Sequence, residues 1–252
     1  MEKTGMIQNK KIVVGILPTI HLYETNDPYE DRYVFINNYP KKIYESGAIP
    51  VGLLFNDGKI SLEQLDMCDA FLFPGGSRID HELYKVLLYA YQKKKSVLGI
   101  CMGMQAMAIF SVMQEETHGK YLSLSSEEIN AIYQKMKKEN PTLNILGHSN
   151  IHGDVTVHRD NIDEAKHLIQ ISNNSFLQKV YKGNEANVVS LHNVVVQRVG
   201  PLFKVSARAS DGVIEAIESV DDKLFWIGVQ FHPEVTDEKL IKMWIEKISA
   251  FL

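Results

Sequence analysis

The stretch from Val97 to Gln105, which reads Val-Leu-Gly-Ile-Cys-Met-Gly-Met-Gln, decides the fold. An apolar strand ends within it, Cys101 follows, and a helical pattern begins at once. Gly99 and Gly103 lie two residues before and two residues after the cysteine, which is the spacing of a nucleophile elbow. Such an elbow places the reactive side chain at the carboxyl end of a strand, beside a helix N-terminus that favours negative charge. The residues alone leave a second interpretation open, a structural cysteine on a tight turn.

Outward from this stretch, strand patterns and helix patterns alternate through the first hundred residues. The predicted strands span residues 12–17, 49–54, 70–73 and 96–99. The predicted helices span residues 32–46, 79–92 and 102–113, and Ser61 with Gln64 has the spacing of a further capping box. This alternation predicts an α/β fold with a mostly parallel sheet and helices on both of its faces.

The second half of the chain has a different pattern. Residues 114–150 are polar, and only residues 125–138 look helical there, with Ser125 and Glu128 at capping-box spacing. Further strands are predicted at 155–157, 167–171, 188–191, 203–207, 213–217 and 224–229, followed by a helix at 237–251. The simplest account is a single domain over residues 1–252 with a helical insertion at about 114–150.

Composition narrows the class of protein. The chain has 252 residues, 45% of them hydrophobic, and a net charge of -4. Lysine and arginine (27) are fewer than aspartate and glutamate (31), so no nucleic-acid partner is expected. No apolar run approaches the ~18 residues of a membrane span, and the N-terminus lacks a signal-peptide pattern. With only two cysteines, Cys68 and Cys101, we expect a cytoplasmic protein without disulfides.

A cysteine nucleophile needs a base, and His232 is the best candidate among nine histidines. Most of the others, His167 among them, lie in polar loops or near the ends of elements and are expected to be solvated. His232 follows the predicted strand and precedes Pro233, which stops that strand. Glu234 is two residues further on, close enough to orient one ring nitrogen while the other faces a thiol. A histidine near an acid at a strand end is common, so this spacing alone leaves the role open.

The segment Phe73 to Ser77, Phe-Pro-Gly-Gly-Ser, offers an oxyanion hole. Glycines let the backbone come close to a ligand. The N–H groups of Gly76 and Met102 would form the two-donor hole that acyl transfer requires. An ordinary strand-to-helix turn is the alternative.

Two segments in this chain order resemble the class I glutamine amidotransferase superfamily: 99–105, Gly-Ile-Cys-Met-Gly-Met-Gln, and 228–234, Gly-Val-Gln-Phe-His-Pro-Glu. Within it the chain most resembles the γ-glutamyl hydrolase branch, the peptidase C26-like proteins that include γ-glutamyl-γ-aminobutyrate hydrolase. Residues 74–76, 190–192 and 211–217 carry this narrower resemblance. The resemblance as a whole extends from about residue 12 to residue 234, with a weak stretch at 109–150.

The resemblance implies a role for each matching residue. Cys101 would be the nucleophile, His232 the base and then the acid, and Glu234 the orienting acid. Gly76 and Met102 would give the oxyanion N–H groups. The residues implied in substrate binding at the glutamyl end are Gln105, Ser190, Leu191 and His192.

The implied reaction passes through a γ-glutamyl thioester and needs no metal and no organic cofactor. The expected partner is a small γ-glutamyl substrate, and in one interpretation a second copy of the chain in a homodimer. Three other functions remain open: a glutaminase subunit that delivers ammonia to a synthetase, a γ-glutamyl transferase, and a non-catalytic binding protein. The intact set of Cys101, His232 and Glu234 argues against the last.

The chain departs from the branch around the expected pocket. Met102 stands where many relatives have arginine, and Asn193 and Val194 follow the Ser-x-His motif where histidine or glycine and then glutamine are common. The predicted helix at 125–138 replaces a short strand-forming stretch. These differences leave the implied chemistry in place and leave the identity of the leaving amine open.

Overall fold

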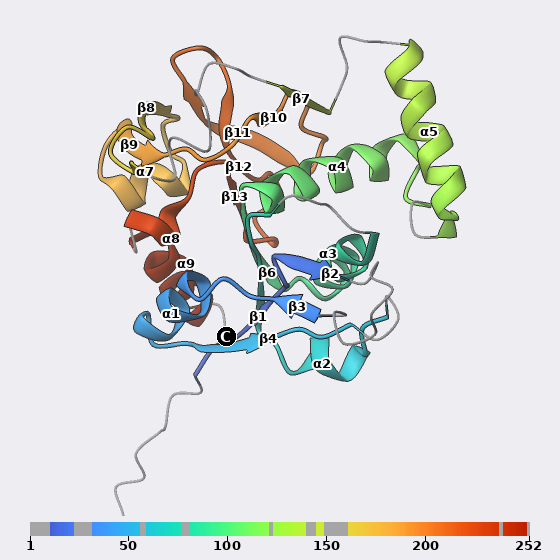
Figure 1. Ribbon diagram of the computed structural model, residues 1–252, viewed down its shortest axis with the longest axis horizontal. Helices are drawn as coiled ribbons and strands as arrows, with labels where there is room; N and C mark the ends of the chain where they lie inside the picture. The colour runs from blue at the N-terminus through green and yellow to red at the C-terminus, as the bar shows by residue number, and fades with distance from the viewer. Residues whose placement is uncertain are drawn as a thin grey trace, which may run out of the picture.

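A central sheet organises the protein, seen in a computed structural model (Figure 1). The structure describes residues 11–22, 32–55, 59–76, 81–120, 123–139, 145–148, 161–236 and 239–250. Among these residues, eleven strands form one sheet with the main order β4-β1-β5-β6-β13-β12-β11-β8-β9. The α/β fold class predicted from the sequence is confirmed, and the sheet is mixed.

The first half of the sheet is parallel. Its strands are β4 (Ile49–Gly52), β1 (Val13–Ile16), β5 (Ala70–Phe73), β6 (Ser96–Ile100) and β13 (Trp226–Val229). Every residue of β5, β6 and β13 is buried. Continuous apolar runs are typical of parallel strands that helices cover on both faces. These are the runs that the sequence marks most plainly.

The second half of the sheet is antiparallel. Its strands are β12 (Ile214–Ser219), β11 (Phe203–Ala209), β8 (Lys166–Ile171) and β9 (Glu185–Val189). The short strand β10 (Val194–Val196) pairs with β12 and with β7 (Leu146–His148). Exposed and buried residues alternate along much of β8, as expected for a strand with one solvated face.

Helices cover the two faces of the sheet and create two cores. On one face, α3 (His81–Lys93) and α4 (Met102–Glu116) pack over β5, β6 and β13. On the other face lie α1 (Asn38–Glu45), α7 (Phe176–Tyr181), α8 (Pro233–Thr236) and α9 (Lys239–Ser249). Each core contains one fully buried tryptophan, Trp226 in the first and Trp244 in the second.

The insertion predicted at 114–150 contains a helix, α5 (Ser126–Glu139), which stands beyond α4 at the outside of the molecule (Figure 1). Its predicted capping box is confirmed: the Glu128 N–H donates to Ser125 Oγ at 3.2 Å, and the Ser125 N–H donates to Glu128 Oε2 at 2.7 Å. At α2 (Leu62–Asp66), Ser61 Oγ accepts the Gln64 N–H, but the Gln64 amide bonds to the backbone of Leu54 instead of closing a box.

Some element predictions were wrong. The helix predicted over 32–46 begins only at Asn38, because residues 32–34 form strand β3 (Arg32–Val34), paired with β2 (Ile20–Leu22) in a separate small sheet. Helix α7 and strands β7 and β10 were not predicted. The strand predicted at 155–157 lies outside the described residues.

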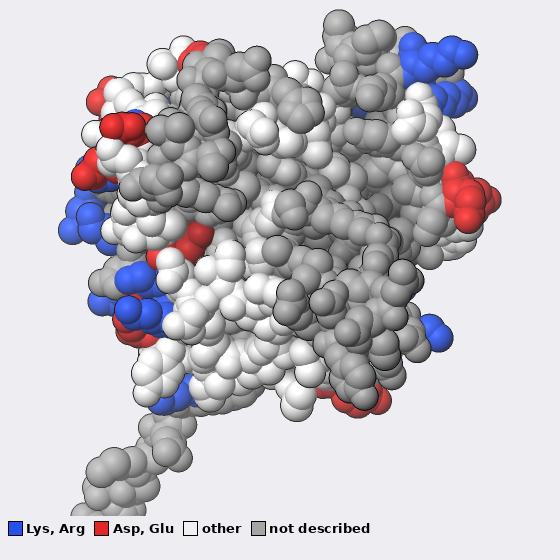
Figure 2. Space-filling model, in the orientation of Figure 1, with Lys and Arg blue, Asp and Glu red and all other residues white. Residues whose placement is uncertain are grey.

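The surface carries both signs of charge. On the face shown in Figure 2, acidic and basic side chains both lie along the left edge. No helix in the described ranges has the length and apolar character needed to cross a membrane.

Candidate active site

Cys101 lies at the carboxyl end of β6, where the chain turns directly into α4. Its backbone has φ 51° and ψ -106°, in the left-handed half of conformational space, where a non-glycine residue is strained. The Cys101 N–H donates to Val229 O at 2.7 Å, and Cys101 O accepts the Gln105 N–H at 3.1 Å. The residue is therefore fixed between strand and helix in the geometry of a nucleophile elbow.

The two glycines of the elbow permit close packing against neighbouring backbone. A Cβ added at Gly103 would lie 2.2 Å from the carbonyl oxygen of Phe73. A Cβ added at Gly99 would lie 2.8 Å from the carbonyl carbon of Gly103. Contacts this short do not occur in folded proteins, so the strand-helix turn requires glycine at both positions.

His232 and Glu234 lie at the carboxyl end of β13, beside the elbow. The His232 Nδ1 atom and Glu234 Oε1 are 2.7 Å apart, and both side chains are buried. The His232 N–H donates to Val189 O at 2.9 Å, which attaches this loop to the end of β9. The structure thus brings the predicted base and its predicted orienting acid into contact.

The electrostatic field around His232 favours its charged form. Burial alone would lower the pKa of His232, but the charges of Cys101 and Glu234 outweigh it and raise the pKa to about 10. A charged imidazole beside a thiol is one of the environments that favour a cysteine nucleophile. Cys68 differs: it lies in the core of the α3 and α4 face, and burial raises its pKa to about 11.

Tyr39 on α1 belongs to the same site, and it is not among the residues predicted from the sequence. Its hydroxyl accepts the Gly75 N–H at 2.9 Å. Burial, and then the charge of Glu234, raise the pKa of Tyr39 well above its usual range, so the hydroxyl stays protonated. Tyr39 and Ile43 form the buried face of α1 at helical spacing, which signals burial but not the role of the hydroxyl.

The predicted oxyanion segment lies against the elbow. A Cβ added at Gly75 would be 2.8 Å from His232 Cε1 and 3.4 Å from Cys101 Cβ. A Cβ added at Gly76 would be 3.0 Å from the Met102 sulfur. The glycine pair therefore borders Cys101 and His232, and the Met102 side chain is buried against Gly76 rather than standing in solvent.

The four residues implied in substrate binding lie on two segments near the elbow. Gln105 is buried on the first turn of α4, and its amide donates to Val194 O at 3.1 Å and to Gln230 Oε1 at 3.4 Å. Ser190 and His192 are buried, and Leu191 is partly exposed. Burial, and then the charge of His232, lower the pKa of His192 to about 4, so His192 lies within the field of the candidate base.

His167 was expected to be solvated, and that expectation was wrong. It lies on β8 with a side chain that is 20% exposed, and its ring faces the buried carboxylate of Glu215. His192 faces the same carboxylate from the other side. The sequence gives no signal for this grouping, because its members come from three different segments.

The sheet order, the elbow and the adjoining His-Glu pair define the class I glutamine amidotransferase-like fold. Three relatives support this class. A glutamine amidotransferase-like protein of Rickettsia prowazekii (strain Madrid E) is 26% identical over 94% of this chain and 96% of its own length. CTP synthase of Thermosipho africanus is 30% identical over 68% of this chain, which spans only 32% of that enzyme. The glutaminase domain of Trypanosoma brucei CTP synthase, solved with bound acivicin, superposes with a TM-score of 0.62 at 16% identity, over 96% of this chain and 94% of that one.

The model of the Peptidase C26 family matches residues 84–234, which is more than half of the chain. The chain therefore belongs to the Peptidase C26 family. The superfamily predicted from the two sequence segments is confirmed, and family membership implies an amide hydrolase. The matched range contains both Cys101 and His232 and ends at Glu234.

Proposed function

We propose that the protein hydrolyses the γ-glutamyl amide bond of a small γ-glutamyl compound, with Cys101, His232 and Glu234 as its catalytic triad. The observation that carries the proposal is the strained Cys101 at the strand-helix turn, beside an imidazole whose Nδ1 is 2.7 Å from Glu234. A nucleophile, a base and an orienting acid in this order are the working parts of acyl transfer.

The proposed reaction has two halves. His232 accepts the Cys101 thiol proton, and the sulfur attacks the γ-carbonyl carbon of the substrate. The C–N bond breaks, the amine leaves with the proton from His232, and the γ-glutamyl group remains as a thioester on Cys101. In the second half His232 takes a proton from water, the hydroxide attacks the thioester, and glutamate leaves as the sulfur regains its proton.

Backbone and pocket residues would assist both halves. The N–H groups of Gly76 and Met102 are proposed to hold the negative oxygen that develops in each half, where one lost donor typically costs about 10²–10³ in kcat. Gln105, Ser190, Leu191 and His192 are proposed to line the glutamyl pocket. The packing of the Met102 side chain against Gly76 shows that the two residues are neighbours.

The test compares two cysteines in one chain. The wild type, Cys101→Ala and Cys68→Ala are each incubated with γ-glutamyl-aminobutyrate, other γ-glutamyl amines, γ-glutamyl dipeptides and glutamine, and released glutamate is measured by mass spectrometry. We expect Cys101→Ala to lose at least about 10⁴-fold in kcat and Cys68→Ala to keep its turnover with some loss of stability. Glutamate release by Cys101→Ala at the wild-type rate would refute the proposal.

A glutaminase subunit is the second candidate, because the relatives include CTP synthase and its glutaminase domain. Cleavage of free glutamine alone, together with stable co-purification of a synthetase, would favour it. A γ-glutamyl transferase would instead form a new γ-glutamyl amide when an acceptor amine is added, so the same mass spectra distinguish all three.

A further inference from the structure

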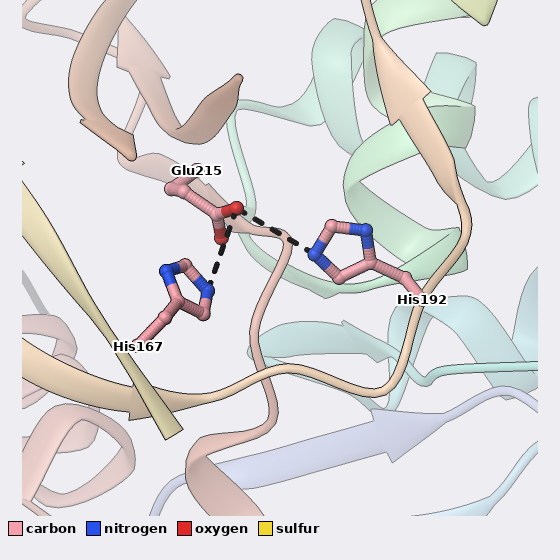
Figure 3. A group of neighbouring side chains, drawn as sticks. All are labelled: His167, His192 and Glu215. Carbon is pink, nitrogen blue, oxygen red and sulfur yellow. Dashed lines mark ion pairs between the residues drawn. The ribbon is translucent and has the colours of Figure 1, made fainter. Parts of the chain in front are cut away.

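Beside the candidate active site lies a second group of side chains with ligand chemistry: His167, His192 and Glu215. Figure 3 shows the two imidazole rings on either side of the Glu215 carboxylate, each with a ring nitrogen directed toward it. One ligand atom from each residue lies within 4.8 Å of the other two. The proposed hydrolysis uses neither His167 nor Glu215.

A β-bulge aims Glu215 into this group. Along the β11–β12 pair, Ala207 lies opposite Ala216 and Arg208 lies opposite Ile214, so Glu215 is an extra residue without an opposite number on β11. Bulges redirect a side chain and are frequent next to functional sites. His167 comes from β8, beyond the last paired residue of β11, and His192 comes from the segment after β9.

The distances fit ligands around an ion better than a direct hydrogen bond. Glu215 Oε1 is 3.7 Å from His167 Nε2 and 3.6 Å from His192 Nε2. A direct N–H···O bond is about 2.7–3.2 Å long. Two ligand atoms at about 2.0–2.2 Å from a tetrahedral zinc ion are about 3.3–3.6 Å apart. The separation from His192 lies at the upper end of that range, and the separation from His167 is slightly above it.

Burial and exposure also suit an ion site. The Glu215 side chain is fully buried, and the His192 side chain is 2% exposed. A charged carboxylate at this depth is stabilised by a nearby cation. The His167 side chain is 20% exposed while its Nε2 atom is buried, so this ring separates the group from solvent.

We propose that His167, His192 and Glu215 bind one divalent transition-metal ion of the zinc type. Two imidazole nitrogens and one carboxylate oxygen form a donor set that suits Zn²⁺. The ion takes no part in the thioester cycle. It joins β8 and β12 to the 190–192 segment, which starts beside the His232 backbone, and so fixes one wall of the proposed glutamyl pocket.

The first experiment measures metal binding without using activity. The full chain carrying Cys101→Ala is freed of metal with a chelator and titrated with Zn²⁺ by calorimetry, and with Co²⁺ by visible absorption. The Cys101→Ala background removes a second zinc site that Cys101 and His232 could form. We expect one ion per chain, and at least a tenfold weaker Kd when His167→Ala or Glu215→Gln is added.

The matched control is His118→Ala, which removes an exposed histidine at the end of α4 and should leave the Kd unchanged. Thermal melting gives a second readout, since Zn²⁺ at a hundredfold excess over Kd should raise Tm by about 5–10 °C. His167→Ala should melt like the wild type without metal and gain nothing from Zn²⁺.

Three results would overturn the site. These are less than one ion per chain, a Kd insensitive to His167→Ala, and binding by the wild type that Cys101→Ala abolishes. Because none of these readouts depends on turnover, failure of the metal site and failure of the proposed hydrolysis are separately visible.

Discussion

The parallel and antiparallel halves of the sheet each present a buried group of ionisable side chains at the same edge. In the parallel half, Cys101 and the His232–Glu234 pair follow the ends of two adjacent strands, β6 and β13. In the antiparallel half, His167, His192 and Glu215 meet through a bulge and a loop. The first group depends on short segments with strong local patterns, whereas the second depends on register between distant strands.

This difference has a physical reason. A parallel strand followed by a helix fixes where its last side chain points, so glycine spacing around one cysteine is informative. In an antiparallel pair, a shift of one residue turns every side chain to the other face, and one bulge can reverse the pattern locally. Two pairs of variants and a pH profile test whether the parallel half is the more tightly determined region.

The largest expected effect is on folding, at the elbow. Gly103→Ala places a Cβ 2.2 Å from the Phe73 carbonyl oxygen, so the helix and the strand must separate. We expect a loss of about 3 kcal/mol or more in the free energy of unfolding, measured by urea denaturation.

Its control lies in the antiparallel half. A Cβ added at Gly183, between α7 and β9, has nothing within 4 Å, so Gly183→Ala should change stability by less than about 0.5 kcal/mol. Equal losses from the two variants would remove the contrast between the halves.

Next in size is the loss of one buried hydroxyl. Tyr39→Phe leaves the Gly75 N–H without its acceptor, and we expect a loss of about 1–3 kcal/mol in stability. Since Gly75 precedes the proposed oxyanion donor Gly76, kcat should also fall, by roughly tenfold.

Ser111→Ala gives the matched comparison. Ser111 Oγ accepts the Leu202 N–H at 3.0 Å, and Ser111 is as buried as Tyr39. It has no proposed part in catalysis. This variant should lose stability on a similar scale and keep its kcat. If Tyr39→Phe also kept its kcat, the Tyr39 hydroxyl would be structural only.

The third test follows stability as the pH changes, and its effect builds up gradually over several pH units. Because the pKa of His232 is raised from 6.5 to about 10, the folded protein holds this proton more tightly than the unfolded chain does. The resulting stability is complete below pH 6.5 and disappears as the pH rises through about 10, with a slope of at most about 1.4 kcal/mol per pH unit.

The measurement compares unfolding free energies of the wild type and His232→Gln from pH 6 to pH 10.5. The wild type should lose its pH-dependent advantage over this range. A difference between the two proteins that stays constant with pH would contradict the raised pKa.

The sequence predicted much of the fold and the candidate residues at the elbow. Buried runs such as 70–73 and 96–99 gave strands at nearly the right bounds, and the spacing around Cys101 indicated the strand-helix turn. Both signals are local, since neighbouring residues determine a buried strand and a tight turn. The contact between His232 Nδ1 and Glu234 is also local, because the two residues are only two positions apart in the chain.

The remainder could not be predicted for reasons of geometry. Tyr39 reaches Gly75 across 36 positions, and only the packing of α1 on the sheet brings them together. His167 was expected in solvent because its neighbours in sequence are polar, but the β11–β12 bulge turns Glu215 toward it. Residues 32–34 are predicted as helix from their local pattern. They form a strand because they pair with β2, a separate segment of the chain.

The two tryptophans, one in each core, give the protein a built-in optical label for each face of its sheet. Trp226 packs among Phe110, Phe203 and Tyr91 beneath α3 and α4, whereas Trp244 lies on α9 against the opposite face. Since the chain has no other tryptophan, the tryptophan emission of a Trp226→Phe variant comes only from the α1 and α9 layer, and that of a Trp244→Phe variant only from the α3 and α4 layer. Emission spectra of the pair therefore show whether the two layers lose their packing in one step or in sequence.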